Sequence, residues 1–139
     1  YLVPRPAVFP PPTVTLCSLS ATSLHNAPHN LRPVNPYIRC KLGSAKRWQS
    51  AVLKMTSNPD WAGEEATFNV CAGEEEVVVQ VLDWKPVKHR LLCQATVSLG
   101  SLPANADGPT ALDVEVDMRW RPGAKGRLKV GVWVRDVER

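Results

Sequence analysis

Apolar and polar residues alternate strictly near the C-terminal end of the chain, a pattern typical of β-structure. Every second residue is apolar in residues 112–118 and again in residues 128–134. Successive side chains of a β-strand point to opposite faces of a sheet, so each segment is predicted to be a strand with one buried face. The wet face of the first segment carries acids and that of the second carries cations, so we expect ion pairs across a hairpin.

Similar short apolar segments recur along the chain, separated by turn-forming residues. Residues 76–84 are nearly all apolar, as expected for a central strand that is buried on both faces. No segment has the apolar period of a helix. The fold class predicted is all-β, an eight-stranded antiparallel β-sandwich. The eight expected strands are residues 13–19, 36–43, 47–54, 66–70, 76–84, 91–99, 112–118 and 128–134.

The start of the chain differs in composition from the rest. Residues 1–12 contain five prolines, and proline fixes φ and lacks an N–H, so this segment is predicted to be a proline-rich linker. Residues 13–139 are predicted to form a single β-sandwich domain. The chain begins with Tyr1 and shows no signal peptide, so we expect a fragment of a longer protein. No apolar run approaches the about 18 residues of a membrane span, so we expect a soluble protein.

Four cysteines, Cys17, Cys40, Cys71 and Cys93, stand in apolar segments without C-x-x-C spacing. Free thiols in such positions behave as small apolar residues, so we expect reduced core cysteines and a cytoplasmic location. Attachment to the periphery of a membrane or a cytoskeletal structure remains open. The net charge of +4 permits an acidic partner. Acidic clusters interrupt any basic track, so we expect no nucleic acid partner.

Residues that could carry catalysis are sparse. There is no nucleophile motif, phosphate-binding glycine loop or metal-protease helix. His25 and His29 have a proline between them, which favours two solvated loop histidines over a zinc site with Cys17. Asp83 and His89 can meet across a loop, but without a nucleophile they form no catalytic site. We therefore expect no enzyme, no catalytic residue and no cofactor.

Four motifs follow the order and spacing of a known family, the C2 domain. Residues 35–43 (N-P-Y-I-R-C-K-L-G) resemble its D-P-Y-V-x-V-x-L-G strand, and residues 57–61 (S-N-P-D-W) are similar to its N-P-x-W turn. Residues 77–84 (V-V-V-Q-V-L-D-W) resemble its central strand and the aspartate that opens its third loop. Residues 91–99 (L-L-C-Q-A-T-V-S-L) stand in place of its F-L-G-x-x-x-I-x-L. The resemblance implies a C2-like domain over residues 13–139, with a final strand similar to that of the type II circular permutation.

The calcium site of that family is degenerate in this sequence. Calcium-binding members use about five acidic side chains from the first and third loops, because calcium prefers about 6–8 oxygen ligands. Asn35 replaces the aspartate that closes the first loop, and residues 23–34 contain no acid. Asp83 keeps the first acidic position of the third loop, but Lys85 and Arg90 stand at the next two. The resemblance implies no calcium and no other metal, with Asp83 paired to a neighbouring cation.

Two classes of function remain for a calcium-independent member of that family. We expect a non-catalytic module that scaffolds or localises a larger intracellular protein through protein–protein contacts. The alternative is binding of phosphoinositides or an anionic phospholipid membrane through a basic face. A continuous basic patch would favour the lipid, and a scattered group would favour the scaffold. The basic-face candidates are Arg39, Lys41, Lys46, Arg47 and Lys54.

Side chains of the loops add further candidate contacts. Leu24 and Leu31 of the first loop are also candidates for an interface, and Trp120 and Trp133 are candidate exposed aromatics. Structural explanations stay open beside these: the cations can simply solvate the outer face of a sheet, and the tryptophans can stack under arginines. The oligomeric state is left open. The third-loop candidates for contact with a lipid or partner are Trp84, Lys85, Val87, Lys88 and Arg90.

Overall fold

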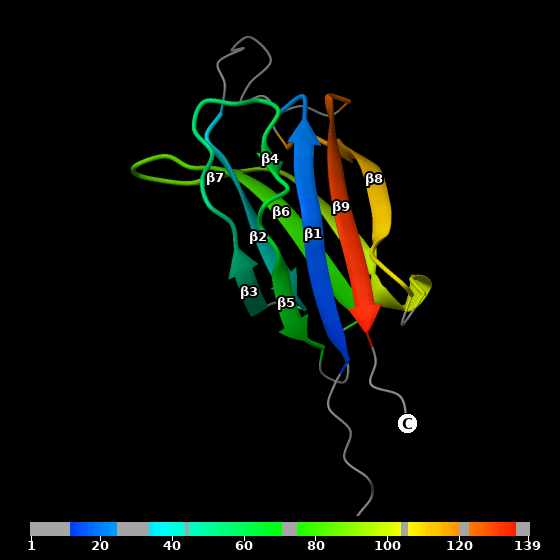
Figure 1. Cartoon of the computed structure of the whole chain (residues 1–139). Helices are drawn as coiled ribbons and strands as arrows, with labels where there is room; N and C mark the ends of the chain where they lie inside the picture. Colours follow the sequence, from blue (N-terminus) through cyan, green and yellow to red (C-terminus); the bar gives the residue numbers. More distant parts are fainter. Residues whose placement is uncertain are drawn as a thin grey trace, which may run out of the picture.

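The computed structural model describes residues 12–24, 34–43, 45–70, 75–103, 106–119 and 123–135. The strands in these ranges are β1 (Thr13–Thr22), β2 (Pro36–Leu42), β3 (Ala45–Gln49), β4 (Asp60–Trp61), β5 (Ala66–Asn69), β6 (Glu76–Asp83), β7 (Arg90–Ser98), β8 (Thr110–Asp117) and β9 (Lys125–Arg135), and a 3-10 turn, η1 (Leu99–Ser101), follows β7. They form two antiparallel sheets that pack face to face (Figure 1). One sheet has the order β4-β1-β9-β8, with β5 also paired to β1, and the other has the order β3-β2-β6-β7. The predicted all-β sandwich is confirmed.

The core lies between the inner faces of the two sheets. In β2, the alternating residues Ile38, Cys40 and Leu42 are all buried, as the sequence predicts. Strand β6 is buried from Val79 to Asp83, which agrees with its predicted position as a central strand. The apolar residues of β9 pack on the same core from the other sheet. Burial of these apolar faces is the main favourable contribution to folding.

The β8–β9 hairpin carries the expected ion pairs. Lys125 pairs with Asp117, which lies directly opposite it in the strand register. Arg127 contacts Asp113 diagonally, with its Nε and one terminal nitrogen 3.0 and 2.9 Å from the same carboxylate oxygen. All four side chains are exposed, so the pairs add little stability and mainly keep this face of the sheet wet.

The third strand differs from the prediction. The sequence predicts a strand over residues 47–54, whereas β3 ends at Gln49. The physical reason is Ser50, whose hydroxyl accepts the Ile38 N–H at 2.8 Å and so takes the place of a carbonyl in the ladder. The chain then leaves the sheet, and Lys54 lies on a connection instead of a strand.

A ninth strand, β4, escapes sequence reasoning because two residues are too few to show a period. It pairs with β1 through Leu19 and Trp61, and β5 pairs with the same edge of β1 through Leu16 and Ala66. The two strands therefore act as one interrupted edge strand. The Trp61 indole, 2% exposed, fills the core at the interruption and donates to the Ala51 carbonyl at 3.0 Å.

The described cysteines are free thiols. Cys40 and Cys93 are buried, and burial raises the pKa of both thiols to about 12. Thiols with so high a pKa carry little thiolate at neutral pH and are unreactive. Cys17 is half-buried on β1.

Trp133 is fixed on the surface of the sandwich. Its Nε1 donates to the Ala106 carbonyl at 2.8 Å, and the Arg135 guanidinium lies 4.4 Å from the centre of its ring. Of the two interpretations open from the sequence, stacking under an arginine is the one that the structure supports for Trp133.

Several expectations concern residues outside the described ranges. They include the linker up to residue 11, His25, His29, Cys71, Leu31 and Trp120. The boundaries of the linker and of the domain stay predictions, as does the type II permutation. In the part of the chain that the structure describes, no helix is long and apolar enough to cross a membrane.

Strands β1 and β9 approach each other closely at Gly131, which lies opposite Cys17. A Cβ at position 131 would lie 2.9 Å from the Cys17 Sγ and 3.3 Å from the Cys17 carbonyl oxygen. Gly131→Ala should therefore lower the free energy of unfolding by about 1–3 kcal/mol in urea denaturation, because the strands must shift. Gly108→Ala is the control, since its Cβ would meet nothing within 4 Å. Equal stability of the two variants would contradict this packing.

Candidate functional site

Two connections lie at one end of the sandwich. Residues 50–59 join β3 to β4, and residues 84–89 join β6 to β7 and project from the body of the molecule (Figure 1). Arg119, just after β8, is attached nearby through its backbone N–H, which donates to the Leu92 carbonyl at 2.8 Å. We call residues 50–59, residues 84–89 and Arg119 the loop end.

Asn35, immediately before β2, joins the two connections of the loop end. Its side-chain oxygen accepts the Met55 N–H at 2.9 Å, and its side-chain nitrogen donates to the Trp84 carbonyl at 3.4 Å. Its backbone carbonyl accepts the Trp84 N–H at 2.8 Å. An aspartate could accept from Met55 but could not donate to Trp84 when ionised. The amide therefore has a structural role that an ionised acid cannot fill.

The carboxylate of Asp83 is the buried charge of this site. Asp83, the last residue of β6, is 2% exposed. One carboxylate oxygen accepts the Asn35 N–H at 2.9 Å, and the other lies 3.3 Å from the Lys85 ammonium nitrogen. Arg90 stands directly opposite Asp83 in the β6–β7 register. A buried carboxylate requires such compensation, and Lys85 is the cation that pairs with it.

These contacts occupy the oxygens that a calcium ion would need. Both oxygens of Asp83 and the side-chain oxygen of Asn35 already accept hydrogen bonds or pair with a cation. Over the described ranges, no group of three or more His, Cys, Asp or Glu side chains could hold a metal ion. Lys85 and Arg90 stand where the resemblance implies further acids.

His89 has a different partner from the Asp83 that the sequence suggested. Its Nδ1 lies 2.6 Å from the Tyr37 hydroxyl, and the two rings meet edge to face. The Trp84 ring lies 6.1 Å from the His89 ring, centre to centre. Burial raises the pKa of the Tyr37 phenol, with the nearby Arg39 charge opposing the shift, so the phenol stays protonated at neutral pH. The aromatic contact anchors residues 84–89 at their base.

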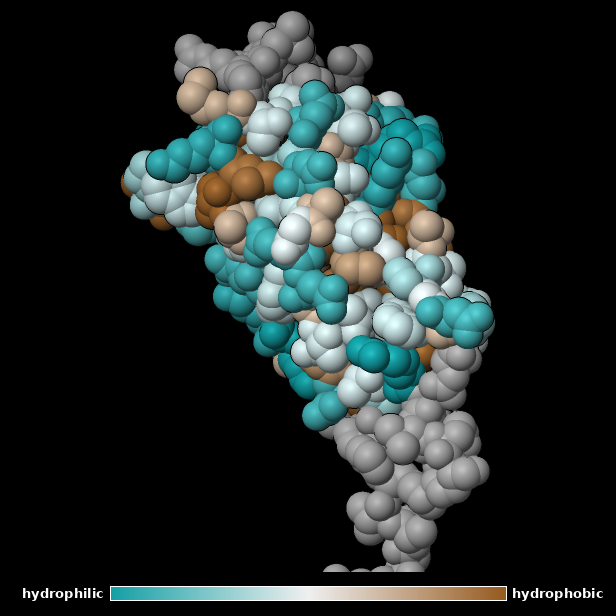
Figure 2. Space-filling view, viewed as in Figure 1, coloured by the Kyte–Doolittle hydropathy of each residue, from teal (hydrophilic) through white to brown (hydrophobic). Residues whose placement is uncertain are grey.

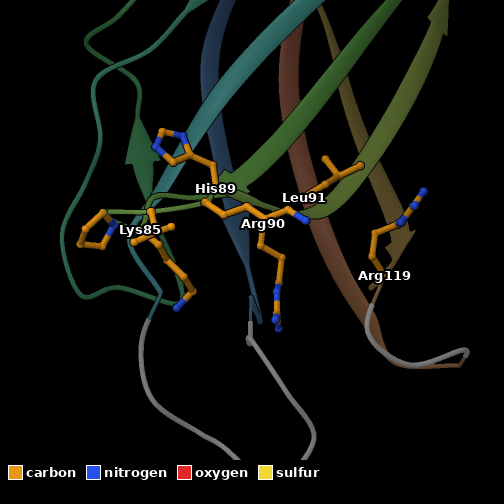
Figure 3. Close-up of a pocket in the computed structure, with 8 residues that line it drawn as sticks. Lys85, His89, Arg90, Leu91 and Arg119 are labelled. Carbon is orange, nitrogen blue, oxygen red and sulfur yellow. The ribbon is translucent and has the colours of Figure 1, made fainter.

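A hollow of about 760 Å³ lies between the 84–89 connection, the start of β7 and Arg119 (Figure 3). In the close-up, Lys85 and Arg90 extend in the same direction, and Arg119 lies across from them beyond Leu91. None of the lining residues is acidic. We call this site the cationic hollow; its lining residues are Lys85, Pro86, Val87, Lys88, His89, Arg90, Leu91 and Arg119.

Large apolar side chains are exposed beside these cations. Val87 is 98% exposed, Met55 73% and Trp84 39%. The space-filling view shows hydrophobic surface next to hydrophilic surface where this part of the molecule projects (Figure 2). Leu24, a first-loop candidate for the same interface, is instead fully buried in the core. It is excluded from contact because it packs under the loop end.

Three of the basic-face candidates share the outer face of the four-stranded sheet. Lys41 on β2 lies opposite Lys46 on β3. The Arg39 Nε donates to the Gln80 side-chain oxygen at 2.8 Å, and Lys46 donates to Gln49 at 2.7 Å. Arg39 and Lys46 are therefore tied to neighbouring amides along the sheet.

The other two basic-face candidates lie elsewhere. Arg47 turns toward the second sheet, where a terminal nitrogen donates to the Asn69 carbonyl at 3.0 Å and the guanidinium lies 6.0 Å from the Phe68 ring centre. Lys54 is exposed on the connection of residues 50–59, at the loop end. The sandwich thus divides the five residues among three places.

Two residues of the loop end were not identified from the sequence. Arg119 follows an alternating strand, and nothing in the sequence signals that this strand end meets β7. Met55 is an isolated apolar residue in a polar stretch, and only the structure shows its exposure. Surface patches made by residues distant in the chain leave no local pattern.

Comparisons with known proteins agree with this architecture. The family model described as C2 domain matches residues 13–114. No curated protein matches the sequence. The solved structure of a C2 domain of plant extended synaptotagmin 1, its domain A, is 19% identical, with 94% of this chain and 98% of that chain covered and a TM-score of 0.74.

Two other solved structures are larger than this chain. Human GIVD cytosolic phospholipase A2 is 16% identical with a TM-score of 0.72, covering 96% of this chain but only 17% of that enzyme. The calcium-bound pair of C2 domains of extended synaptotagmin 2, its domains A and B, is 19% identical with a TM-score of 0.69, covering 88% of this chain and 45% of that one. At these identities the likeness concerns the fold alone.

The ion pair of Lys85 with buried Asp83 predicts a measurable effect on stability. Lys85→Met keeps the length of the side chain but removes the charge, so it should lower the free energy of unfolding by about 1 kcal/mol. The effect is limited because the Lys85 side chain is 42% exposed and water replaces part of the interaction. Lys88→Met, which removes one charge from the same connection, should change stability by less than half as much in guanidinium denaturation. Equal losses would show that Lys85 does not compensate Asp83.

Proposed function

Because this chain belongs to the C2 domain family, we propose that it is a non-catalytic, calcium-independent interaction module that docks a larger protein on an anionic membrane surface. The observation that carries the proposal is the composition of the loop end. Exposed Val87, Met55 and Trp84 stand beside several cations, and the one carboxylate at the site is already compensated by Lys85.

Calcium independence follows from the environment of Asp83. In a calcium-dependent site, the ion neutralises several carboxylates and supplies the positive charge that meets the anionic partner. Here the Lys85 ammonium lies 3.3 Å from the Asp83 carboxylate, and Arg90 stands opposite it. A divalent cation would have to displace Lys85 and approach Arg90 against electrostatic repulsion. The positive charge is therefore a permanent part of the chain.

A membrane suits both components of the loop end. Each Lys or Arg close to an anionic membrane surface contributes about 1 kcal/mol of attraction, which salt screens. Val87 at 98% exposure loses water contact when it enters the interfacial region, so burial of its side chain adds to the binding. Neither component alone would give firm attachment, whereas the combination would be additive and sensitive to ionic strength.

Protein contacts are the second candidate, and the dispersal of the basic-face residues favours them for that part of the surface. Arg39, Lys41 and Lys46 lie on the outer face of a sheet, whereas Arg47 contacts Asn69 on the other sheet. A scattered group of this kind suits an acidic protein surface better than one lipid headgroup. This surface and the loop end are separate, so variants can distinguish the two functions.

The test is co-sedimentation with vesicles of phosphatidylcholine, with or without phosphatidylserine, each in calcium and in chelator. We expect binding only with phosphatidylserine, equal in calcium and chelator, and weaker at higher salt. Met55→Asp should reduce binding about tenfold, because it replaces an exposed apolar side chain with a charge that the membrane repels. Met55 has φ +54°, a conformation that Asp tolerates well, so this variant should fold normally.

Two variants serve as controls. Ser98→Asp adds the same charge at the other end of β7 and should bind as the unchanged protein does. Arg39→Glu/Lys41→Glu tests the outer face: loss of binding in this variant, with binding retained in Met55→Asp, would move the docking surface to that face. Binding that requires calcium would contradict the assignment at Asp83, and no sedimentation with any vesicle would leave the protein-scaffold function.

A further inference from the structure

We propose that the cationic hollow binds a phosphomonoester, a phosphate group attached by a single ester bond. This inference rests on the proposed function and names the ligand of the same loop end. A phosphomonoester carries a charge of about −1.5 to −2 at neutral pH and three terminal oxygens that accept hydrogen bonds. The hollow offers the complementary set: cations from two separate parts of the chain and no acid in its lining.

The charge balance of the hollow favours an anion. Lys85, Lys88, Arg90 and Arg119 line it, and the carboxylate that contacts the group is Asp83, beneath Lys85. Asp83 is 2% exposed, so its charge lies below the surface and not in the hollow. One buried carboxylate against four cations leaves a net positive potential at the opening, which a doubly charged group would neutralise more completely than a singly charged one.

The backbone holds these cations in fixed positions around the hollow. Arg119 is attached through its N–H to the carbonyl of Leu92, two residues from Arg90. Met118, the residue before it, is 3% exposed and anchors this point of the chain in the core. On the other side, the pair with Asp83 fixes the direction of Lys85. The distance between the two sides is therefore set by the sandwich and not by a mobile partner.

The side chains supply suitable donors. Guanidinium groups match the oxygens of a phosphate with paired N–H bonds, and an ammonium has three donors, so Lys85 can keep Asp83 and still reach a ligand. Figure 3 shows Lys85 and Arg90 extending together, with Arg119 across from them. Arg119 is an exposed residue whose several torsions allow it to turn toward the same phosphate. The volume of about 760 Å³ lies within the roughly 300–1,000 Å³ typical of ligand sites.

The position of the hollow favours a lipid headgroup as the source of the phosphate. Val87 both lines the hollow and is 98% exposed, so a headgroup bound there would have its acyl chains next to an apolar side chain. Phosphatidylserine contains only a phosphodiester, whereas phosphorylated inositol lipids carry phosphomonoesters. The hollow should therefore select phosphorylated inositol lipids over phosphatidylserine at equal surface charge.

The test uses soluble inositol trisphosphate as the probe, with binding measured by isothermal titration calorimetry. Arg119→Gln should weaken binding about tenfold, since it removes charge-assisted hydrogen bonds to the phosphate. Arg135→Gln removes one positive charge from the last residue of β9, where Arg135 stacks on Trp133, and should bind within about twofold of the unchanged protein. Inorganic phosphate should compete weakly, and vesicles with phosphatidylinositol bisphosphate should bind more tightly than phosphatidylserine vesicles of equal charge.

The outcomes separate this inference from the membrane function. Inositol trisphosphate binding that Arg119→Gln does not change, or no binding at all, would overturn the phosphate site even if vesicles still bind. Inositol trisphosphate binding without binding to any vesicle would keep the site and overturn membrane docking. Met55→Asp should bind the soluble probe normally while losing vesicles. Tighter binding of a phosphopeptide than of inositol trisphosphate would overturn the lipid source.

Discussion

The buried carboxylate of Asp83 is the interaction on which the loop end depends. It lies where β2 begins, β6 ends and the 84–89 connection leaves the sheet, and it is shielded from water. A charge in that position must be compensated, and here a backbone N–H and the ammonium of Lys85 do so. Because Lys85 is only two residues from Asp83, the pair also sets the direction in which the connection begins.

Compensation by a lysine changes what can control the site. A carboxylate cluster neutralised by calcium acquires its positive charge only when the ion is present, and its partner binding follows the calcium concentration. An ammonium attached to the chain is present at all calcium concentrations. The controls that remain are ionic strength, which screens the charges, and the charge of the partner itself. A module built this way suits constant attachment or attachment governed by the composition of a surface.

The sequence predicts the sandwich well because the core imposes a period of two. Ile38, Cys40 and Leu42 alternate with wetter residues, and the buried set follows directly from that pattern. The ion pairs of the β8–β9 hairpin follow from the same period. The prediction fails where a single side chain replaces a backbone bond, as Ser50 does at the end of β3. Local hydrogen bonds of this kind have no period and cannot be recognised from alternation.

The candidate site is less predictable because its parts come from distant segments. The sequence identifies Asp83, Lys85 and Arg90, since the resemblance aligns them with a known loop. It does not identify Arg119, whose place beside β7 depends on how the two sheets close against each other. It also treats Arg39 to Lys54 as one basic group, whereas strand register and the exit of the chain at Ser50 separate them. Proximity in sequence and proximity on a β-sandwich surface are different quantities.

Met55 shows why stability alone does not explain the loop end. Its side chain is 73% exposed and its φ is +54°, a region where an L-residue with a long side chain is uncommon and costs about 1–2 kcal/mol relative to glycine. The hydrogen bond from its N–H to Asn35 holds it there. Asparagine or glycine would fit this backbone better and would leave less apolar surface in water. A methionine therefore contributes nothing to folding that another residue would not do better, and the feature it does add is an apolar contact on the same end as the cations.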